Sequence, residues 1–202
     1  MTLVLSTAYF PPVHYFTAIS REETIYLEAH ENFTKQSYRN RCQILTAQGS
    51  RDLVVPVKHG KGKKIPIIDV QIDYDQPWQK NHWKSIETAY NRSPFFEFYK
   101  DHLIHYFEKR YDTLFEMNHL ILEQCFPFLR IKKTILTTLT HQHDYPSDCL
   151  DLRSALHPKL PLPIVFNPKT YPQVFDDRQS FQPGLSILDL LFSQGPNAWS
   201  KL

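Results

Sequence analysis

Glycine is scarce in this sequence and cysteine is scarcer. Only 5 of the 202 residues are glycine, against 15 prolines and 14% aromatic residues, so we expect stiff loops lined by aromatic side chains instead of mobile glycine-rich lids. The three cysteines, Cys42, Cys125 and Cys149, are an odd number without a CxxC spacing. This argues against a disulfide framework and a cysteine-based zinc site, and favours buried free thiols.

An excess of charge of either sign is also lacking. The 23 basic and 21 acidic residues leave a formal net charge of +2, far from the basic excess of a dedicated nucleic-acid-binding protein. We therefore expect a small-molecule substrate or a protein partner, and no nucleic acid.

Long apolar runs and targeting signals are absent from the sequence as well. No stretch of 18 apolar residues occurs, and the apolar start MTLVLSTAYFPP has no preceding basic segment and no small-residue cleavage site. Membrane insertion is not expected, and the expected localisation is cytoplasmic.

The common nucleotide and hydrolase motifs GxGxxG, GxxxxGK[ST], HExxH and GxSxG do not occur. The nearest approach is GKGKK at 60–64. No helix start follows it to bind a phosphate, so a solvated hairpin tip is favoured over a phosphate loop.

Hydrophobic periodicity predicts one layered domain over residues 1–202. Strand-like runs lie at 3–7, 24–30, 42–47, 53–57, 67–73 and 132–140, and the runs around Gly49 form the expected hairpin. Helical spacing covers 78–91 and 99–126, the latter as one long helix or a helix pair, and a short helix closes the chain after a proline-rich ordered tail. The expected class is α/β, with a mixed sheet.

Residues 31–42, ENFTKQSYRNRC, concentrate side chains suited to binding an anion or a sugar. In an extended strand, Arg39 and Arg41 face one side and Tyr38 and Asn40 face the other. An arginine can bind a carboxylate or phosphate with two hydrogen bonds, and Lys35 can add a point charge.

Only one face of a half-buried strand can meet a ligand, so these residues cannot all be contacts. We assign Arg41 to the ligand and expect Asn40 to hold the turn. The alternative is that Arg41 forms a structural salt bridge with Glu28 or Glu31.

Two histidine groups are further candidates. His82, followed by Trp83 and two turns later by Tyr90, would face an aromatic-lined cleft from the predicted helix, as a general base or a hydrogen-bond donor. The alternative is a histidine that caps the helix start. The sequence His141-Gln142-His143-Asp144 could hold a divalent metal, but an exposed loop is favoured because no third ligand follows from the spacing.

The blocks AYFPPVHYFTAI, ENFTKQSYRNRCQI with LVVPV, QPWQKNHWKSIETAYNRSPFFEFY, and YPQVF with FQPGLSILDLLFSQGP, in this order, resemble the bacterial WbqC-like protein family over nearly the whole chain. The resemblance implies a role in surface-polysaccharide or related glycan biosynthesis. Its recurrent positions fall on Pro11, Tyr15, Phe16, Phe33, Tyr38, Asn40, Arg41, Pro56, Trp78, His82, Ile86, Tyr90, Gln173, Phe181, Ser186, Asp189 and Gly195.

Two hypotheses follow. The first is a group transferase acting on a sugar or nucleotide-linked sugar, with His82 and Glu28 as acid or base. The second is a non-catalytic ligand-binding or assembly protein of the same pathway, which holds a glycan intermediate or a partner enzyme of the pathway. The expected substrate-binding residues are Tyr9, Tyr15, Lys35, Tyr38, Asn40, Arg41, Trp83 and Tyr90. Convergence of Arg41, His82 and Glu28 in one pocket would favour the first hypothesis.

Overall fold

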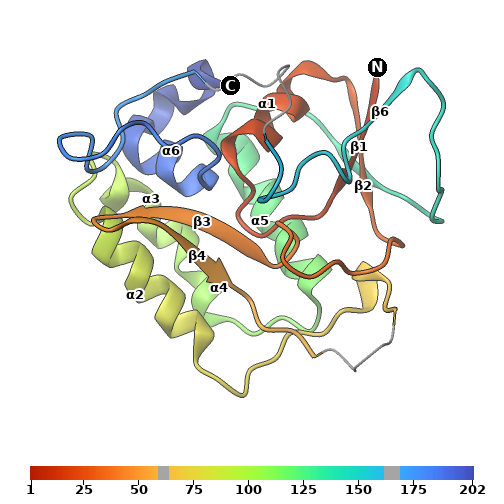
Figure 1. Ribbon diagram of the computed structural model, residues 1–202, viewed down its shortest axis with the longest axis horizontal. Coiled ribbons are helices and arrows are strands. Elements are labelled where there is room, and N and C mark those ends of the chain that lie inside the picture. Colours follow the sequence, from red (N-terminus) through yellow and green to blue (C-terminus); the bar gives the residue numbers. More distant parts are fainter. Residues whose placement is uncertain (59–63, 162–168) are drawn as a thin grey trace.

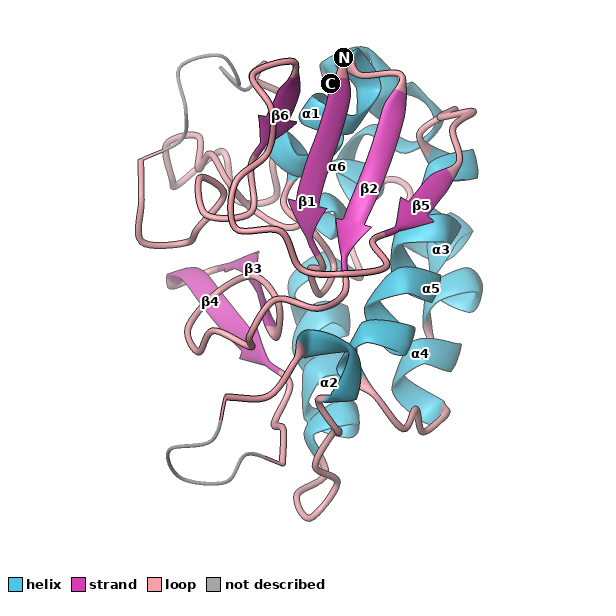
Figure 2. Cartoon of the chain, turned by 90° about the vertical axis from the view of Figure 1, so that its right-hand side faces the viewer, coloured by secondary structure: helices cyan, strands magenta, loops and turns pink. Residues whose placement is uncertain are grey.

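A parallel four-stranded sheet organises the chain. The structure is a computed structural model that describes residues 1–58, 64–161 and 169–202. The sheet has the order β5-β2-β1-β6 (Figures 1 and 2). Its strands are β1 (Thr2–Ser6), β2 (Thr24–Glu28), β5 (Ile135–Thr137) and β6 (Cys149–Asp151). Because all three pairings are parallel, the four carboxyl ends lie along one edge of the sheet.

The crossover from β1 through α1 to β2 follows from the local sequence. Leu3, Val4 and Leu5 are all fully buried, as expected for a parallel strand covered on both faces. Pro12 then ends the extended run and precedes α1 (Val13–Arg21), because proline cannot continue a central strand but is tolerated at a helix start. The ammonium of Lys133 caps α1 by donating to the carbonyls of its last turn.

An antiparallel hairpin forms a second, separate sheet. Strands β3 (Arg41–Thr46) and β4 (Gly49–Val54) pair from Arg41↔Val54 to Thr46↔Gly49. Gly49 has a φ of 107°, a conformation that glycine adopts without strain. The side chains of Ile44 and Leu53 are buried against the rest of the core, so the hairpin is packed onto the domain by one face.

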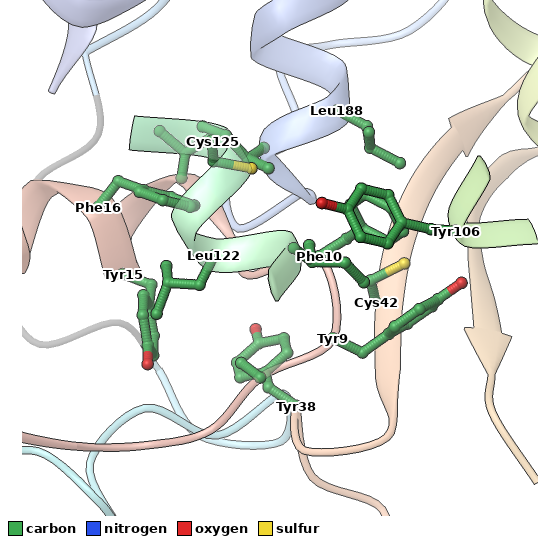
Figure 3. Packing of buried hydrophobic residues seen from close by; sticks show 14 of the residues in the cluster. Tyr9, Phe10, Tyr15, Phe16, Tyr38, Cys42, Tyr106, Leu122, Cys125 and Leu188 are labelled. Atoms are coloured by element: carbon green, nitrogen blue, oxygen red, sulfur yellow. The ribbon is translucent and has the colours of Figure 1, made fainter. Parts of the chain in front are cut away.

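The helices gather behind the parallel sheet and beside its lower edge in the view of Figure 2. The remaining elements are α2 (Trp78–Tyr90), α3 (Phe96–Leu103), α4 (His105–Glu108), α5 (Leu114–Phe128), α6 (Ile187–Gln194) and the 3-10 helices η1 (Ile67–Asp69) and η3 (Gly195–Lys201). Aromatic rings join these elements to the sheet; for example, Phe10 stacks on Phe107 at 5.6 Å between ring centroids. Figure 3 shows Phe10 with other rings and both buried thiols, Cys42 and Cys125, in this core.

The predicted α/β class is confirmed, with the parallel and antiparallel pairings in two sheets. The prediction of a strand over 67–73 is wrong. Pro66 is followed by the 3-10 turn η1, and then only single bridges form, Val57↔Ile72 and Gln71↔Thr113. Backbone groups of this segment pair with several loops instead of one strand, for example Ile68 N–H with the Ala29 carbonyl.

The long helical region is divided. Residues 99–126 contribute to three helices, α3, α4 and α5, and α5 begins where the Thr113 hydroxyl accepts a hydrogen bond from the Glu116 N–H. Strand β6 was not anticipated from the sequence. The greater part of the GKGKK loop and residues 162–168 of the proline-rich tail lie outside the described residues. Within the described ranges, no helix is both long and apolar enough to cross a bilayer.

Candidate functional site

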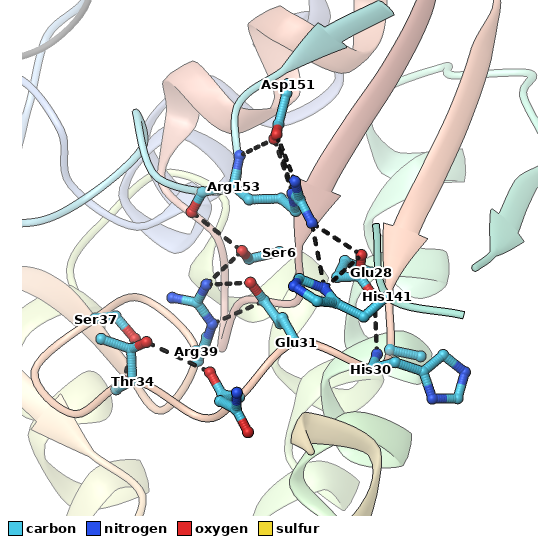
Figure 4. Close-up of polar contacts among 12 residues, drawn as sticks. Ser6, Glu28, His30, Glu31, Thr34, Ser37, Arg39, His141, Asp151 and Arg153 are labelled. Atoms are coloured by element: carbon cyan, nitrogen blue, oxygen red, sulfur yellow. Dashed lines mark hydrogen bonds and ion pairs between the residues drawn. The ribbon is translucent and has the colours of Figure 1, made fainter. Parts of the chain in front are cut away.

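Polar side chains converge at the carboxyl edge of the parallel sheet (Figure 4). Ser6 ends β1, Glu28 ends β2, Thr138 follows β5 and Arg153 follows β6. In open parallel sheets, ligands bind at the carboxyl edge, between two neighbouring strands whose outgoing connections run in opposite directions. In this chain those neighbouring strands are β1 and β6. Strand β1 leads through α1 to β2, which lies on the side of β1 away from β6. We call the group formed by Ser6, Glu28, Glu31, Arg39, His141, Asp151 and Arg153 the edge site.

Glu28 is the centre of the edge site. Its side chain is 0% exposed, and Oε1 accepts hydrogen bonds from the His30 N–H at 2.8 Å and the Thr138 hydroxyl at 2.9 Å. Burial alone would raise the pKa of Glu28, but these two hydrogen bonds and the charges of Arg153 and His141 together lower it. The carboxylate is therefore held in its ionised form at neutral pH.

Arg153 fixes the loop in front of Glu28. Its Nη1 donates to Glu28 Oε2 at 3.1 Å and to the Gln142 carbonyl at 2.8 Å. Its Nε and Nη2 donate to Asp151, and Nη2 also donates to the His143 carbonyl. All five N–H groups of the guanidinium thus have partners within the chain, so Arg153 positions the 141–145 loop and has no donor left for a ligand.

His141 is the half-exposed histidine of the edge site, with 43% of its side chain exposed. Its Nδ1 lies 3.6 Å from Glu28 Oε2 and 3.5 Å from Arg153 Nη1. The 3.6 Å separation from the carboxylate is an ion-pair contact, longer than a hydrogen bond. The contact with Arg153 Nη1 needs Nδ1 as an acceptor, whereas a contact with the carboxylate needs Nδ1–H, so the two contacts belong to different tautomers. An exposed imidazole beside a buried carboxylate is a pair that general acid–base catalysis uses.

Arg39 lies beside this pair. Its Nε and Nη2 donate to the two carboxylate oxygens of Glu31 at 2.8 and 2.6 Å, and Nη2 also donates to Ser6 Oγ at 2.7 Å. Within the described residues, Nη1 has no hydrogen-bond partner. Arg39 lines a small recess of about 10 Å³, room for about one water molecule, with Ser6, Thr7, Tyr15, Tyr38 and Leu156.

The recess contains an unpaired hydrogen-bond donor. The Thr7 hydroxyl, in a residue only 1% exposed, has no partner, and a buried hydroxyl without a partner is costly unless a ligand or water supplies one. A water molecule or a single carboxylate or phosphate oxygen matches the size of the recess and can accept from this hydroxyl.

The residues of 31–42 that we expected to bind one ligand lie in different surroundings. Arg41 forms an ion pair with Asp52 across the hairpin at 2.7 Å, and the Asn40 amide donates to the Val55 carbonyl at 2.9 Å. Lys35 is exposed. Tyr38 lines the recess next to Arg39.

The predicted residues on α2 lie in the core. His82 is 6% exposed, its Nδ1 is 3.1 Å from the Tyr9 hydroxyl, and burial lowers its pKa to about 4. Trp83 packs between Phe96 and Phe107. Among the described residues, no hydrogen bond or ion pair joins Arg41, His82 or Glu28 to another of the three, so their contacts do not give the convergence that the sequence-based transferase hypothesis expects.

Tyr90 and Tyr15 also have partners inside the protein. The Tyr90 hydroxyl donates to Asp189 at 3.0 Å and accepts from the Leu45 N–H at 2.9 Å, which ties α2, α6 and β3 together. The Tyr15 hydroxyl donates to the Ser6 carbonyl at 2.8 Å, and its ring lines the recess. Over residues 1–58, 64–161 and 169–202, no group of three His, Cys, Asp or Glu side chains is placed to hold a metal ion.

The sequence reasoning missed Ser6, Arg39, His141 and Arg153 as members of one site. For Ser6, His141 and Arg153 the usable signal was a position at or just after the end of a strand, whereas Arg39 precedes β3 and gives no such signal. This signal was clear for Glu28 and His141, but it could not be seen for Arg153, because β6 itself was not recognised.

One protein-family model matches the chain. The family model described as "WbqC-like protein family" matches residues 7–157, a range that contains the edge site except for Ser6. The chain is similar to an uncharacterised protein of Mycobacterium tuberculosis, Rv1507c, with 26% identity over 222 aligned positions that cover 96% of this chain and 94% of the relative. No solved structure matches.

Proposed function

The chain belongs to the WbqC-like protein family, and we propose that it is a cytoplasmic biosynthetic enzyme of surface-polysaccharide or related glycan metabolism. In this proposal it is a group transferase that acts on a sugar or a nucleotide-linked sugar. The observation that carries the proposal is the pair of a half-exposed His141 and a fully buried, ionised Glu28 at the carboxyl edge of a parallel sheet. This arrangement supports a general-base role for His141.

The proposed step is a transfer to a substrate hydroxyl. His141 Nε2 accepts the hydroxyl proton while the oxygen attacks the group to be transferred, so that a new bond to this oxygen forms and the bond from the group to its donor breaks. Glu28 stays ionised and stabilises the imidazolium. The departing donor takes the proton back from the imidazolium, which restores the neutral histidine.

Arg39 supplies the binding contribution. Arg39 and Thr7 line the recess, and the Thr7 hydroxyl has no partner; in this proposal Nη1 of Arg39 and this hydroxyl bind a carboxylate or phosphate oxygen of the substrate. The ion pair with Glu31 holds the guanidinium in place before the substrate arrives, so that little side-chain entropy is lost on binding. The sequence-based assignment of His82 as the acid or base is the competing proposal.

The test is a screen followed by a turnover assay. Nucleotide sugars and acyl or aminoacyl donors are tested for an increase in melting temperature, because a ligand that binds the native state stabilises it. Pairs that bind are then incubated with the protein, and products are identified by mass spectrometry. The proposal predicts a transfer product whose rate falls about 10² to 10⁴-fold in His141→Asn.

His143→Asn is the matched control. This neighbour in the same loop has 91% of its side chain exposed and should leave the rate unchanged. Binding without any product, or equal rates for the two variants, would contradict the transferase proposal. The first of these results would favour the ligand-binding protein.

A further inference from the structure

A second polar groove lies far from the edge site, between the end of α2 and the loop before α6. Its lining includes Asn91, Arg92, Ser93, Phe175 and Arg178, and its volume is about 640 Å³. A neighbouring groove of about 530 Å³ along the outer side of α2 shares Phe175 with it. The hairpin separates this region from the edge site by the six residues of β3, roughly 20 Å at the rise of a strand.

A buried hydroxyl without a partner points to a ligand in this groove. Ser93 is 8% exposed, lines the groove, and its Oγ has no hydrogen-bond partner. Ser193 of α6 also lines the groove and has a buried hydroxyl without a partner. Burying two hydroxyls unpaired costs free energy that a polar ligand in the groove would recover.

Phe175 gives the groove an aromatic surface. Its ring is half-buried and lies outside the hydrophobic core cluster, although it lines both grooves. Its φ is 68°, which is strained for a bulky side chain. A strained aromatic residue that does not contribute to the core is unusual for a purely structural position.

The loop that presents Phe175 is fixed at both ends. On one side, the Gln173 amide donates to the buried carboxylate of Asp189 at 3.0 Å. On the other side, the Gln179 amide donates to the Thr46 carbonyl at the hairpin turn, at 2.8 Å. Figure 1 shows this loop beside the turn of β3 and β4. The groove is therefore preformed, as ligand sites usually are.

Charge and chemistry indicate the class of ligand. The lining of the two grooves contains four cationic side chains, Arg51, Lys84, Arg92 and Arg178, and two carboxylates, Asp176 and Asp177. Arg178 is paired with Asp177, whereas Arg92 is exposed and forms no ion pair or side-chain hydrogen bond among the described residues. An aromatic face, unpaired hydroxyls and a free guanidinium match a sugar ring with its hydroxyls and an acidic group.

We propose that this groove is a second ligand site, which binds a saccharide that carries a carboxylate or a phosphate. The sugar ring packs on Phe175, its hydroxyls pair with Ser93 and Ser193, and its acidic group binds Arg92. This site does not depend on the transfer reaction proposed for the edge site.

The experiment is ligand-observed saturation-transfer NMR on the full chain, with glucuronic acid and glucose 6-phosphate as probes and with glucose and succinate as controls. Saturation transfer to the two anionic sugars is expected to exceed that to either control. Phe175→Ala should weaken the binding of the anionic sugars about tenfold.

Two further variants separate binding from folding. Phe98→Ala removes an exposed ring that is outside the groove and should not change binding. Ser93→Ala should weaken binding about fivefold without lowering the melting temperature, because the hydroxyl has no partner in the free protein. No signal from either anionic sugar, an equal signal from succinate, or unchanged binding by Phe175→Ala would overturn the proposal.

Discussion

Replacing Glu28 by glutamine should destabilise the protein far more than its small chemical change suggests. The amide oxygen of the variant can still accept from His30 and Thr138, because both are donors. The amide nitrogen then faces Nη1 of Arg153, where Oε2 of the wild type accepts at 3.1 Å. A donor thus faces a donor in a buried place.

The expected magnitude follows from these contacts. The loss of a hydrogen bond between charged groups costs about 1.5 to 3 kcal/mol, and the removal of one partner from a buried pair costs up to about 5 kcal/mol. Arg153 keeps its contacts with Asp151, which limits the loss. We therefore expect the free energy of unfolding to fall by about 2 to 3 kcal/mol at pH 7.

The stability difference between wild type and Glu28→Gln should also depend on pH, in a direction that follows from the pKa of Glu28. The folded pKa of Glu28 is lowered from its ordinary value of 4.5 by hydrogen bonds and positive charges that outweigh burial. Its contribution to stability is therefore complete above about pH 4.5 and is lost as the pH falls through the folded pKa. Glutamine has no proton to take up, so the difference between wild type and variant should shrink in acid.

The assay is urea unfolding at pH 7 and at decreasing pH, with Asp52→Asn as the control. Asp52 pairs with Arg41 at 2.7 Å with 36% of its side chain exposed, and exposed pairs contribute about 1 kcal/mol or less. A loss in Glu28→Gln no larger than in the control would refute the reasoning. A loss that stays constant from pH 7 down to pH 4 would refute it as well.

Two other substitutions test the structural framework. Tyr90→Phe should lower the unfolding free energy by about 1 to 3 kcal/mol in urea unfolding, because Asp189 and a backbone N–H of β3 lose their shared partner; no change would mean that this network contributes nothing. Gly195→Ala should lower the melting temperature more than Gly184→Ala, since both have positive φ but only at Gly195 would a Cβ collide with the Phe95 ring; equal losses would contradict the close approach.

Local elements of the fold follow from local patterns in the sequence. The apolar runs gave β1 and β2, the turn residues around Gly49 gave the hairpin, and the helical spacing from Trp78 gave α2 almost to the residue. Glu28 was placed near the end of a strand for the same reason. These features depend on neighbours within a few positions of each residue.

The arginine of the recess shows where periodicity is insufficient. The alternation that grouped Arg39 with Arg41 assumed a continuous strand, whereas β3 begins at Arg41. Arg39 therefore lies in the preceding turn, and its side chain is directed to Glu31 and Ser6 instead of to the face of the hairpin. Because the strand starts at Arg41 and not at Arg39, the candidate for ligand binding is Arg39 instead of Arg41.

The partners of Glu28 could not be read from spacing at all. Arg153 is 125 positions away along the chain and Thr138 is 110. Only the parallel order β5-β2-β1-β6 brings them to the same edge. Strand β6 has three residues, of which one is Asp151, and it is too short to produce a pattern.

The most direct test of the central claim compares His141→Asn with His82→Asn. Both variants are assayed for formation of the transfer product at saturating substrate, with circular dichroism to confirm that each is folded. The edge site as the catalytic centre predicts a rate about 10² to 10⁴-fold lower for His141→Asn and a rate near that of wild type for folded His82→Asn. A wild-type rate in His141→Asn together with a large loss in folded His82→Asn would contradict it.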